Sequence, residues 1–220
     1  MIHFIGDSFA AKTLKEGARR RGVLLTDDIR QADLVFVSQD TPTDKDGVRD
    51  LQPIRDLIDS VPDDKVLVIT SQVPPGFCRA LERRVYHQAE TLRIEDGLQR
   101  AMYPEMFIVG CPRELLNILN LDFKLPASYA EYLQAFDCPV LMMTYEDAEF
   151  CKIAINMTLA AQVDNTNRLY AASKRCGADW WRVANVLRHD SRIGKYSYLT
   201  PGRWQDSPHL LRDYVTLKAL

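Results

Sequence analysis

The sequence predicts an α/β fold in which a parallel-sheet domain, residues 1–138, precedes an all-helical domain, residues 139–220. Short apolar runs alternate with helical segments in the first part, as in strands that helices bury on both faces. Residues 146–175 then run without proline or glycine and carry apolar side chains at helical spacing. This pattern predicts one long helix on which the second domain is built.

Each strand of the first domain is expected at a short apolar run that ends at a turn or a polar residue. The expected strands are Ile2–Ile5, Val23–Leu25, Leu34–Val37, Val66–Thr70 and Phe107–Val109, the last closed by Gly110. Helical spacing and helix-end signals predict the remaining helices. These are Asp7–Arg21, Leu51–Ser60, Asp179–Arg188 and Leu210–Leu220.

Composition narrows the classes of function. The chain of 220 residues is 46% hydrophobic and 26% charged, as in ordinary globular domains, and its formal net charge of -2 lacks the basic excess of nucleic-acid-binding proteins. We expect no membrane span and no signal peptide. Its five cysteines include no CxxC pair, so we expect buried free thiols in a reducing cytoplasm and no metal site.

The first strand, a turn beginning at Gly6 and the first helix predict the opening unit of a Rossmann-like, dinucleotide-binding domain. Such turns follow GxGxxG, in which glycines allow a tight turn, close approach of pyrophosphate to backbone N–H groups and close packing of helix on strand. Here Ser8 replaces the second glycine, and Ala11 is an accepted substitute for the third. Asp7 adds a negative charge between the first two positions.

Asp27 lies about twenty residues further on, where a carboxylate often binds the ribose of NAD. Together with the turn it predicts a weakened NAD site. The alternative is a Rossmann-type sheet that no longer binds NAD, in which Asp27 is only a turn residue. The sequence leaves both interpretations open.

Three stretches resemble the UDP-glucose/GDP-mannose dehydrogenase family. The first contains Thr41-Pro42, Asp46-Gly47 and Ser71-Gln72-Val73-Pro74-Pro75-Gly76, similar to the family's TP…DG…STVPxGT. The second contains Ala89-Glu90-Thr91-Leu92-Arg93, Tyr103-Pro104 and Ile108-Val109-Gly110. The third and most specific contains Glu149-Phe150-Cys151-Lys152, Asn156, Asn167, Cys176-Gly177-Ala178-Asp179, Asp190-Ser191-Arg192-Ile193-Gly194 and Pro201-Gly202. The resemblance covers nearly the whole chain.

The resemblance implies NAD-dependent oxidation of a nucleotide sugar, in which a C6 alcohol becomes a carboxylate through two hydride transfers and a cysteine thioester. It also implies a homodimer through the helix at residues 146–175. Two blocks of the family pattern are not found in the sequence, which we therefore interpret as shortened. One block precedes the strand at Leu34–Val37, and the other is the family's C-terminal nucleotide-sugar domain.

The family's catalytic loop, PGxGYGGSCFPKD, corresponds to residues 201–213 of this chain. Pro201-Gly202 and Asp213 fix the alignment and put His209 at the position of the nucleophilic cysteine. An imidazole moves protons but cannot form the thioester that the second oxidation needs. Trp204 and its neighbours replace the loop's glycines, so we expect a loop of different shape.

The resemblance assigns roles to further residues. Lys152 and Asn156 would share one helix face and stabilise negative charge that develops at the substrate. Glu90 would handle the hydrolytic water, and Asp213 would support general-base chemistry. The implied cofactor-binding residues are Gly6, Ser8, Phe9, Asp27, Thr41, Pro42 and Gln72. The implied substrate-binding residues are Arg192, Tyr198, Pro201 and Gly202.

Three functions stay open at this point. The first, which we favour, is an altered family member or pseudoenzyme that binds NAD or a nucleotide sugar without completing the four-electron oxidation. The second is an active NAD(P)-dependent oxidoreductase that transfers a single hydride with His209 or Glu90 as base, because the Lys152/Asn156 pair also resembles that of 3-hydroxyacid dehydrogenases. The third is a purely structural dimer, with the long helix at residues 146–175 as its interface.

Overall fold

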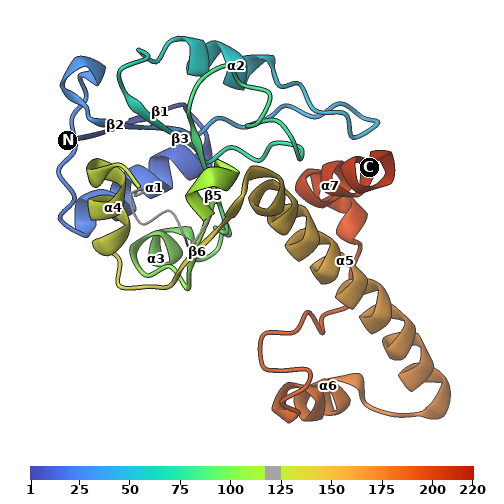
Figure 1. Ribbon diagram of the computed structural model, residues 1–220. Helices are drawn as coiled ribbons and strands as arrows, with labels where there is room; N and C mark the ends of the chain where they lie inside the picture. The colour runs from blue at the N-terminus through green and yellow to red at the C-terminus, as the bar shows by residue number, and fades with distance from the viewer. Residues whose placement is uncertain (117–124) are drawn as a thin grey trace. The chain divides into compact units, whose positions relative to one another are not determined.

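The computed structural model describes residues 1–116 and 125–220, which divide into two compact units (Figure 1). Unit 1 comprises Met1–Pro42 and Arg49–Lys152, and unit 2 comprises Thr43–Val48 and Ile153–Leu220. The sequence put the domain boundary at residue 138. Unit 1 extends further because the segment after this point adds a strand to its sheet and then begins the long helix.

Unit 1 is built on a sheet whose described strands lie in the order β1-β2-β3-β4-β5-β6. The strands are β1 (Ile2–Ile5), β2 (Leu34–Val37), β3 (Val66–Ile69), β4 (Tyr86–Ala89), β5 (Phe107–Cys111) and β6 (Val140–Thr144). All neighbours pair in parallel except β4 and β5, which are antiparallel. The α/β fold class is therefore confirmed, with one antiparallel pair that the sequence pattern did not indicate.

Helices cover both faces of this sheet. On one face α1 (Phe9–Arg20), α3 (Gly97–Met102) and α4 (Ala127–Gln134) contribute to a core with β-strand side chains such as Phe4 and Phe36. These two rings stack with their centroids 4.7 Å apart. On the other face Ile54 and Ile58 of α2 (Gln52–Asp59) pack against β2 and β3. Burial on both faces explains why these strands are continuously apolar.

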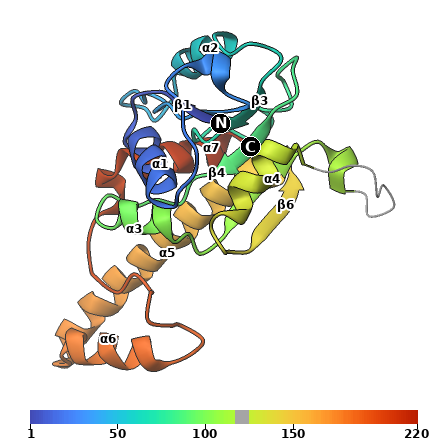
Figure 2. The same cartoon turned by 90° about the vertical axis from the view of Figure 1, so that its left-hand side faces the viewer.

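Two strands escaped prediction, and two details of the expected strands were wrong. β4 reads YHQA, with polar side chains in its centre, and all four residues are buried. β6 is an edge strand beside α4 (Figure 2), as the strand order shows. Its Val140 side chain is exposed. Gly110 continues β5 instead of closing it, because it pairs with the strands on both sides. A glycine is needed there, since an added Cβ would lie 2.9 Å from that of Ala148. The expected strand at Val23–Leu25 is reduced to one bridge between Leu25 and Ile2.

Unit 2 is helical, as predicted. Its helices are the greater part of α5 (Tyr145–Cys176), with α6 (Trp180–His189) and α7 (Pro208–Ala219). Trp180 packs with Ala184 and Leu199 in a small core and donates its Nε1–H to the Leu199 carbonyl at 3.0 Å. The segment Thr43–Val48 lies against α7, where a Cβ on Gly47 would be 2.5 Å from Val215.

The structure also shows how deeply the cysteines are buried and how apolar the helices are. Cys78 and Cys111 are buried, but Cys176 is exposed, so the prediction that all the thiols are buried is wrong. Cys176 ends α5, where a side chain leaves the packed part of the helix. Among the described residues, no helix combines the length and the hydropathy that crossing a membrane requires.

We predict that the free energy of unfolding decreases as the pH is lowered, because His87 is buried in its neutral form. This side chain is 2% exposed on β4, and burial lowers its pKa from 6.5 to about 4. The unfolded chain takes up a proton near pH 6.5, so stability present above this pH is lost as the pH falls toward 4. We expect a loss of about 3 kcal/mol across that range, measured by chemical unfolding.

His87→Gln is the control for this prediction, because it removes the titrating group from the same site. Its free energy of unfolding should change less between pH 6.5 and pH 4 than that of the wild type. Glu149 titrates with the opposite sign, since burial raises its pKa. The difference between the two proteins cancels that contribution, and identical pH profiles would contradict the prediction.

Candidate functional site

The turn between β1 and α1 has the backbone of a phosphate-binding turn. Gly6 adopts a φ of 110°, and a Cβ there would lie 2.0 Å from the Ser38 carbonyl oxygen. Ser8 caps α1: its Oγ accepts the Ala11 N–H at 3.0 Å and donates to the Ser38 carbonyl at 2.9 Å. The hydroxyl therefore binds the first turn of α1 and the end of β2, and it occupies one of the helix's N-terminal donors.

Gln39, which sequence reasoning did not select, bonds to this turn in two directions. Its Oε1 accepts the Asp7 N–H at 3.2 Å, and its Nε2 donates to Asp7 Oδ1 at 2.8 Å. Its backbone N–H donates to Ser71 Oγ at 2.7 Å. One N–H group of the turn is thus already hydrogen-bonded to a side chain of the same unit. The only signal in the sequence was the position of Gln39 directly after the second strand.

The other two cofactor candidates near the N-terminus, Asp27 and Phe9, each have a partner of their own. Asp27 is exposed and pairs with Lys15 Nζ at 2.6 Å, and this ammonium holds the pKa of the Asp27 carboxyl below its usual range. A ribose hydroxyl at Asp27 would have to compete with Lys15. Phe9 is half exposed, with its ring against the start of α3, where a Cβ on Gly97 would lie 2.8 Å from Cζ.

Two cofactor candidates meet at the carboxyl ends of β2 and β3. Buried Thr41 donates from Oγ1 to the Gln72 carbonyl at 3.5 Å, and Arg49 Nη1 donates to the same oxygen at 3.0 Å. Pro42 follows Thr41 and is the last residue of unit 1 before the segment Thr43–Val48, which belongs to unit 2. Ligands of parallel α/β sheets bind outside these strand ends, at the same edge as the turn at Gly6.

Glu149 fixes the loop after β3 to the start of α5. Its side chain is 1% exposed, and its carboxylate accepts the N–H groups of Gly76 at 2.6 Å and Cys78 at 2.8 Å. Burial raises the pKa of Glu149, while these two donors act in the opposite direction. The EFCK motif contained this residue, but only the tertiary structure reveals its partners.

Glu90 and Lys152 are the remaining candidates of unit 1. The Glu90 carboxylate accepts the N–H of Leu92 in its own loop, and Glu90 lines a small cavity with Gln88 and Arg100. Lys152 is the last residue of unit 1, and Asn156 follows one turn later on the same face of α5.

The clearest polar pair of unit 2 is Asn156 with Asp213. Asn156 Nδ2 donates to Asp213 Oδ2 at 2.6 Å, and both side chains are buried. His209 lies four residues before Asp213, so α7 presents both on one side. A buried carboxylate oriented by an amide is an arrangement that supports a proton-transfer step.

The predicted substrate-binding loop is held along α5 through its backbone. Asn167 accepts the Gly202 N–H at 2.9 Å and donates to the Gly202 carbonyl at 2.7 Å. Thr166 Oγ1 donates to the Tyr198 carbonyl at 2.8 Å. Pro201 lies between these two anchor points.

Two residues near this loop have other partners. Trp204 donates from Nε1 to Asp164 Oδ1 at 2.9 Å, and its ring contacts that of Tyr214 with centroids 5.3 Å apart. A bulky indole thus occupies a position where the family pattern has glycine. Arg192 is exposed beyond α6 and pairs with Asp190 at 2.6 Å.

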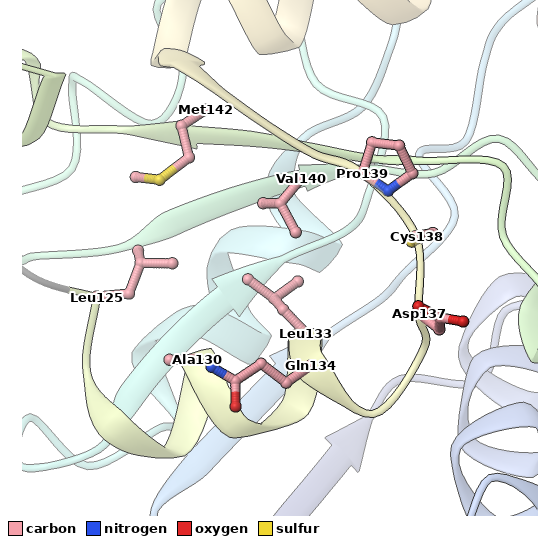
Figure 3. Close-up of a pocket in the computed structure, with 9 residues that line it drawn as sticks. All are labelled: Leu125, Ala130, Leu133, Gln134, Asp137, Cys138, Pro139, Val140 and Met142. Atoms are coloured by element: carbon pink, nitrogen blue, oxygen red, sulfur yellow. The ribbon is translucent and has the colours of Figure 1, made fainter.

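An apolar pocket of about 590 Å³ lies between α4 and β6 of unit 1 (Figure 3). Leu133, Val140 and Met142 line it, with Asp137 at its margin. It contains none of the predicted site residues, so its size does not make it the candidate site. Among the described residues, no cluster of histidine, cysteine or carboxylate side chains could hold a metal ion.

The backbone of the turn in unit 1 is suited to binding the phosphates of a dinucleotide. One of its N–H groups, however, is already bonded to a side chain, and a phosphate would have to displace that bond. Gly6 supplies the required left-handed conformation, and α1 begins directly afterwards with N–H groups directed out of its first turn. The Asp7 N–H, however, is bonded to Gln39. Gly6 and Ser8, with Thr41 and Gln72 at the neighbouring strand ends, are the residues that would hold the dinucleotide.

Comparison with known proteins agrees with this architecture. The model of the UDP-glucose/GDP-mannose dehydrogenase family, central domain, matches residues 146–218. The chain is 25% identical over 209 residues to the UDP-glucose 6-dehydrogenase of Rickettsia typhi, covering 89% of this chain and 46% of that protein. It is 27% identical over 183 residues to UDP-glucose 6-dehydrogenase TuaD of Bacillus subtilis, covering 76% of this chain and 38% of that protein.

A solved structure shows the same fold. The UDP-glucose dehydrogenase from the hyperthermophilic archaeon Pyrobaculum islandicum matches with a TM-score of 0.71 at 20% identity, over 99% of this chain and 67% of that one. The chain spans less than half the length of the two curated relatives above. The family resemblance predicted from the sequence is therefore confirmed.

We predict that removal of the Glu149 carboxylate strongly destabilises unit 1. Glu149→Ala should lower the free energy of unfolding by about 2–4 kcal/mol, because it leaves the N–H groups of Gly76 and Cys78 without their acceptor. Glu146→Ala is the matched control on the same helix. Its exposed ion pair with Arg79 should contribute less than about 1 kcal/mol. Equal losses in chemical unfolding would contradict the role assigned to Glu149.

Proposed function

Because the chain resembles the UDP-glucose/GDP-mannose dehydrogenase family in sequence and in fold, we propose that it binds a nicotinamide dinucleotide and a nucleotide sugar without completing the four-electron oxidation. The observation that carries the proposal is His209 on α7, at the position of the family's nucleophilic cysteine. The residues that support proton transfer are retained, whereas the thiol is not.

The missing thiol separates the two halves of the family's reaction. A thiolate adds to an aldehyde and forms a hemithioacetal, from which the second hydride can leave; the resulting thioester is then hydrolysed. His209 can hold or move a proton, but it cannot form that thioester. When bound, NAD would supply a hydride acceptor, but the missing thiol removes the covalent intermediate from which the second hydride would leave.

The proposed roles of the other residues follow their chemistry. Lys152 and Asn156 provide an ammonium and an amide for negative charge at the reacting oxygen. Asp213 accepts a hydrogen bond from Asn156 and serves the proton transfer. The proposed water-handling residue is Glu90. Arg192, Tyr198, Pro201 and Gly202 are the proposed contacts of the nucleotide sugar.

The experiment measures binding and reaction separately. At about 100 times its dissociation constant a bound ligand adds roughly 2.7 kcal/mol of stability, so any ligand that binds, from NADH and a panel of UDP- and GDP-sugars, is visible as a rise in melting temperature. We expect shifts with NADH and with one sugar, and no sugar acid in the product mixture. Comparing His209→Cys with His209→Ser, which lacks the thiolate, shows whether the missing thiol alone blocks the second oxidation.

The outcomes distinguish the alternatives. Two NADH formed per sugar by the wild type would contradict the proposal and indicate the complete dehydrogenase reaction. One NADH per sugar would favour an oxidoreductase that transfers a single hydride. No shift with any ligand would remove both binding functions and favour a structural dimer.

We further propose that the protein is a homodimer through α5. Leu169 on this helix is exposed, as is Trp181 on α6, and apolar side chains of this size favour burial against a partner. In light scattering we expect twice the mass of one chain. Leu169→Lys should shift the mass toward the monomer, whereas Leu24→Lys, at an exposed leucine of unit 1, should not. A monomeric wild type would contradict this contact.

A further inference from the structure

The side chain of Gln39 lies over the turn that would receive the dinucleotide phosphates. Its Oε1 accepts the Asp7 N–H at 3.2 Å and lies 3.3 Å from the point where a Cβ on Gly6 would stand. A carboxamide oxygen in this position makes the bond that a phosphate oxygen would make. The Asp7 N–H is thus satisfied by an acceptor of its own chain.

A second bond makes this closure mutual. Gln39 Nε2 donates to the Asp7 carboxylate at 2.8 Å, so one side chain satisfies both the backbone N–H and the charged group of the same residue. The Asp7 charge would repel a pyrophosphate, and the carboxamide holds that charge beside the turn. The backbone of Gln39 is fixed in turn by the bond from its N–H to Ser71 Oγ.

The Gln39 contact differs from the Ser8 contact in how readily it can be released. Ser8 Oγ binds within the first turn of α1 and caps the helix, so its removal would weaken α1 itself. Gln39 reaches the turn from the separate loop after β2, and both of its bonds to Asp7 are exposed. A rotation about its side-chain bonds would open the turn and leave the sheet unchanged.

We propose that Gln39 is a latch on this turn, and that unit 1 accepts a dinucleotide only when the carboxamide has moved off Asp7. This inference rests on the dinucleotide binding proposed above, and Gln39 is the residue that weakens that binding. Gln39 and Asp7 then determine the affinity, while Gly6 and α1 provide the underlying site.

The test is a titration of wild type, Gln39→Ala and Gln52→Ala with NADH, followed by the fluorescence of the nicotinamide. Gln39→Ala should tighten the dissociation constant about five- to thirtyfold, the effect of one or two hydrogen bonds that no longer compete. Gln52→Ala is the matched control, because this exposed glutamine of α2 bonds to Asp56 and not to the turn. Its dissociation constant should equal that of the wild type.

A ligand-free measurement accompanies the titration. Amide hydrogen exchange at Asp7 should be faster in Gln39→Ala than in the wild type, because the N–H loses its acceptor, while the melting temperatures show that both proteins are folded. An unchanged exchange rate would overturn the latch. Asp7→Ser, which removes the charge and one bond, should also tighten NADH binding.

Each result of the titration is decisive. Equal or weaker binding by Gln39→Ala, with a wild type that binds NADH, would overturn the latch and leave the proposed dinucleotide binding intact. No binding by either protein would overturn both. Tighter binding by Gln52→Ala as well would show an effect unrelated to the turn, and it would also overturn the latch.

Discussion

The close approach of the Gly6 turn to the end of β2 is the constraint on which the candidate site depends. The parallel register pairs Ile5 with Val37, so the residues that follow these strands emerge side by side. At this point a Cβ on Gly6 would lie only 2.0 Å from the Ser38 carbonyl. A glycine here lets the turn lie against β2, and the contact brings Ser8 and Gln39 within hydrogen-bonding distance of their partners.

The same strand ends explain how polar residues far apart in the chain form one surface of unit 1. Ser71 follows β3 and receives the N–H of Gln39, while Gln72 beside it receives the hydroxyl of Thr41. Glu149 then joins the continuation of this loop to α5 through two backbone N–H groups. Hydrogen bonds thus connect the turn, two strand ends and the long helix within the unit.

Unit 2 contains one buried polar pair and one loop that is fixed to α5. A buried hydrogen bond joins the Asn156 amide to the Asp213 carboxylate, and the loop at Gly202 is fixed to α5 by Asn167. Imidazole at position 209 and indole at position 204 alter the surroundings of that pair. A carboxylate oriented by an amide, with an imidazole at position 209, favours proton movement over covalent catalysis, and the proposed function rests on this difference.

The sequence by itself determined the fold class, the long helix and the turn at Gly6, because apolar periodicity and glycine positions are local signals. Only the tertiary structure decided the rest. The pattern of β4 is not apolar, yet His87 is buried there, because β4 lies inside the sheet between β3 and β5. Asp7 and Gln39, like Glu149 and Gly76, are distant in the chain. Their bonds depend on strand register and on the packing of α5, which no local pattern encodes.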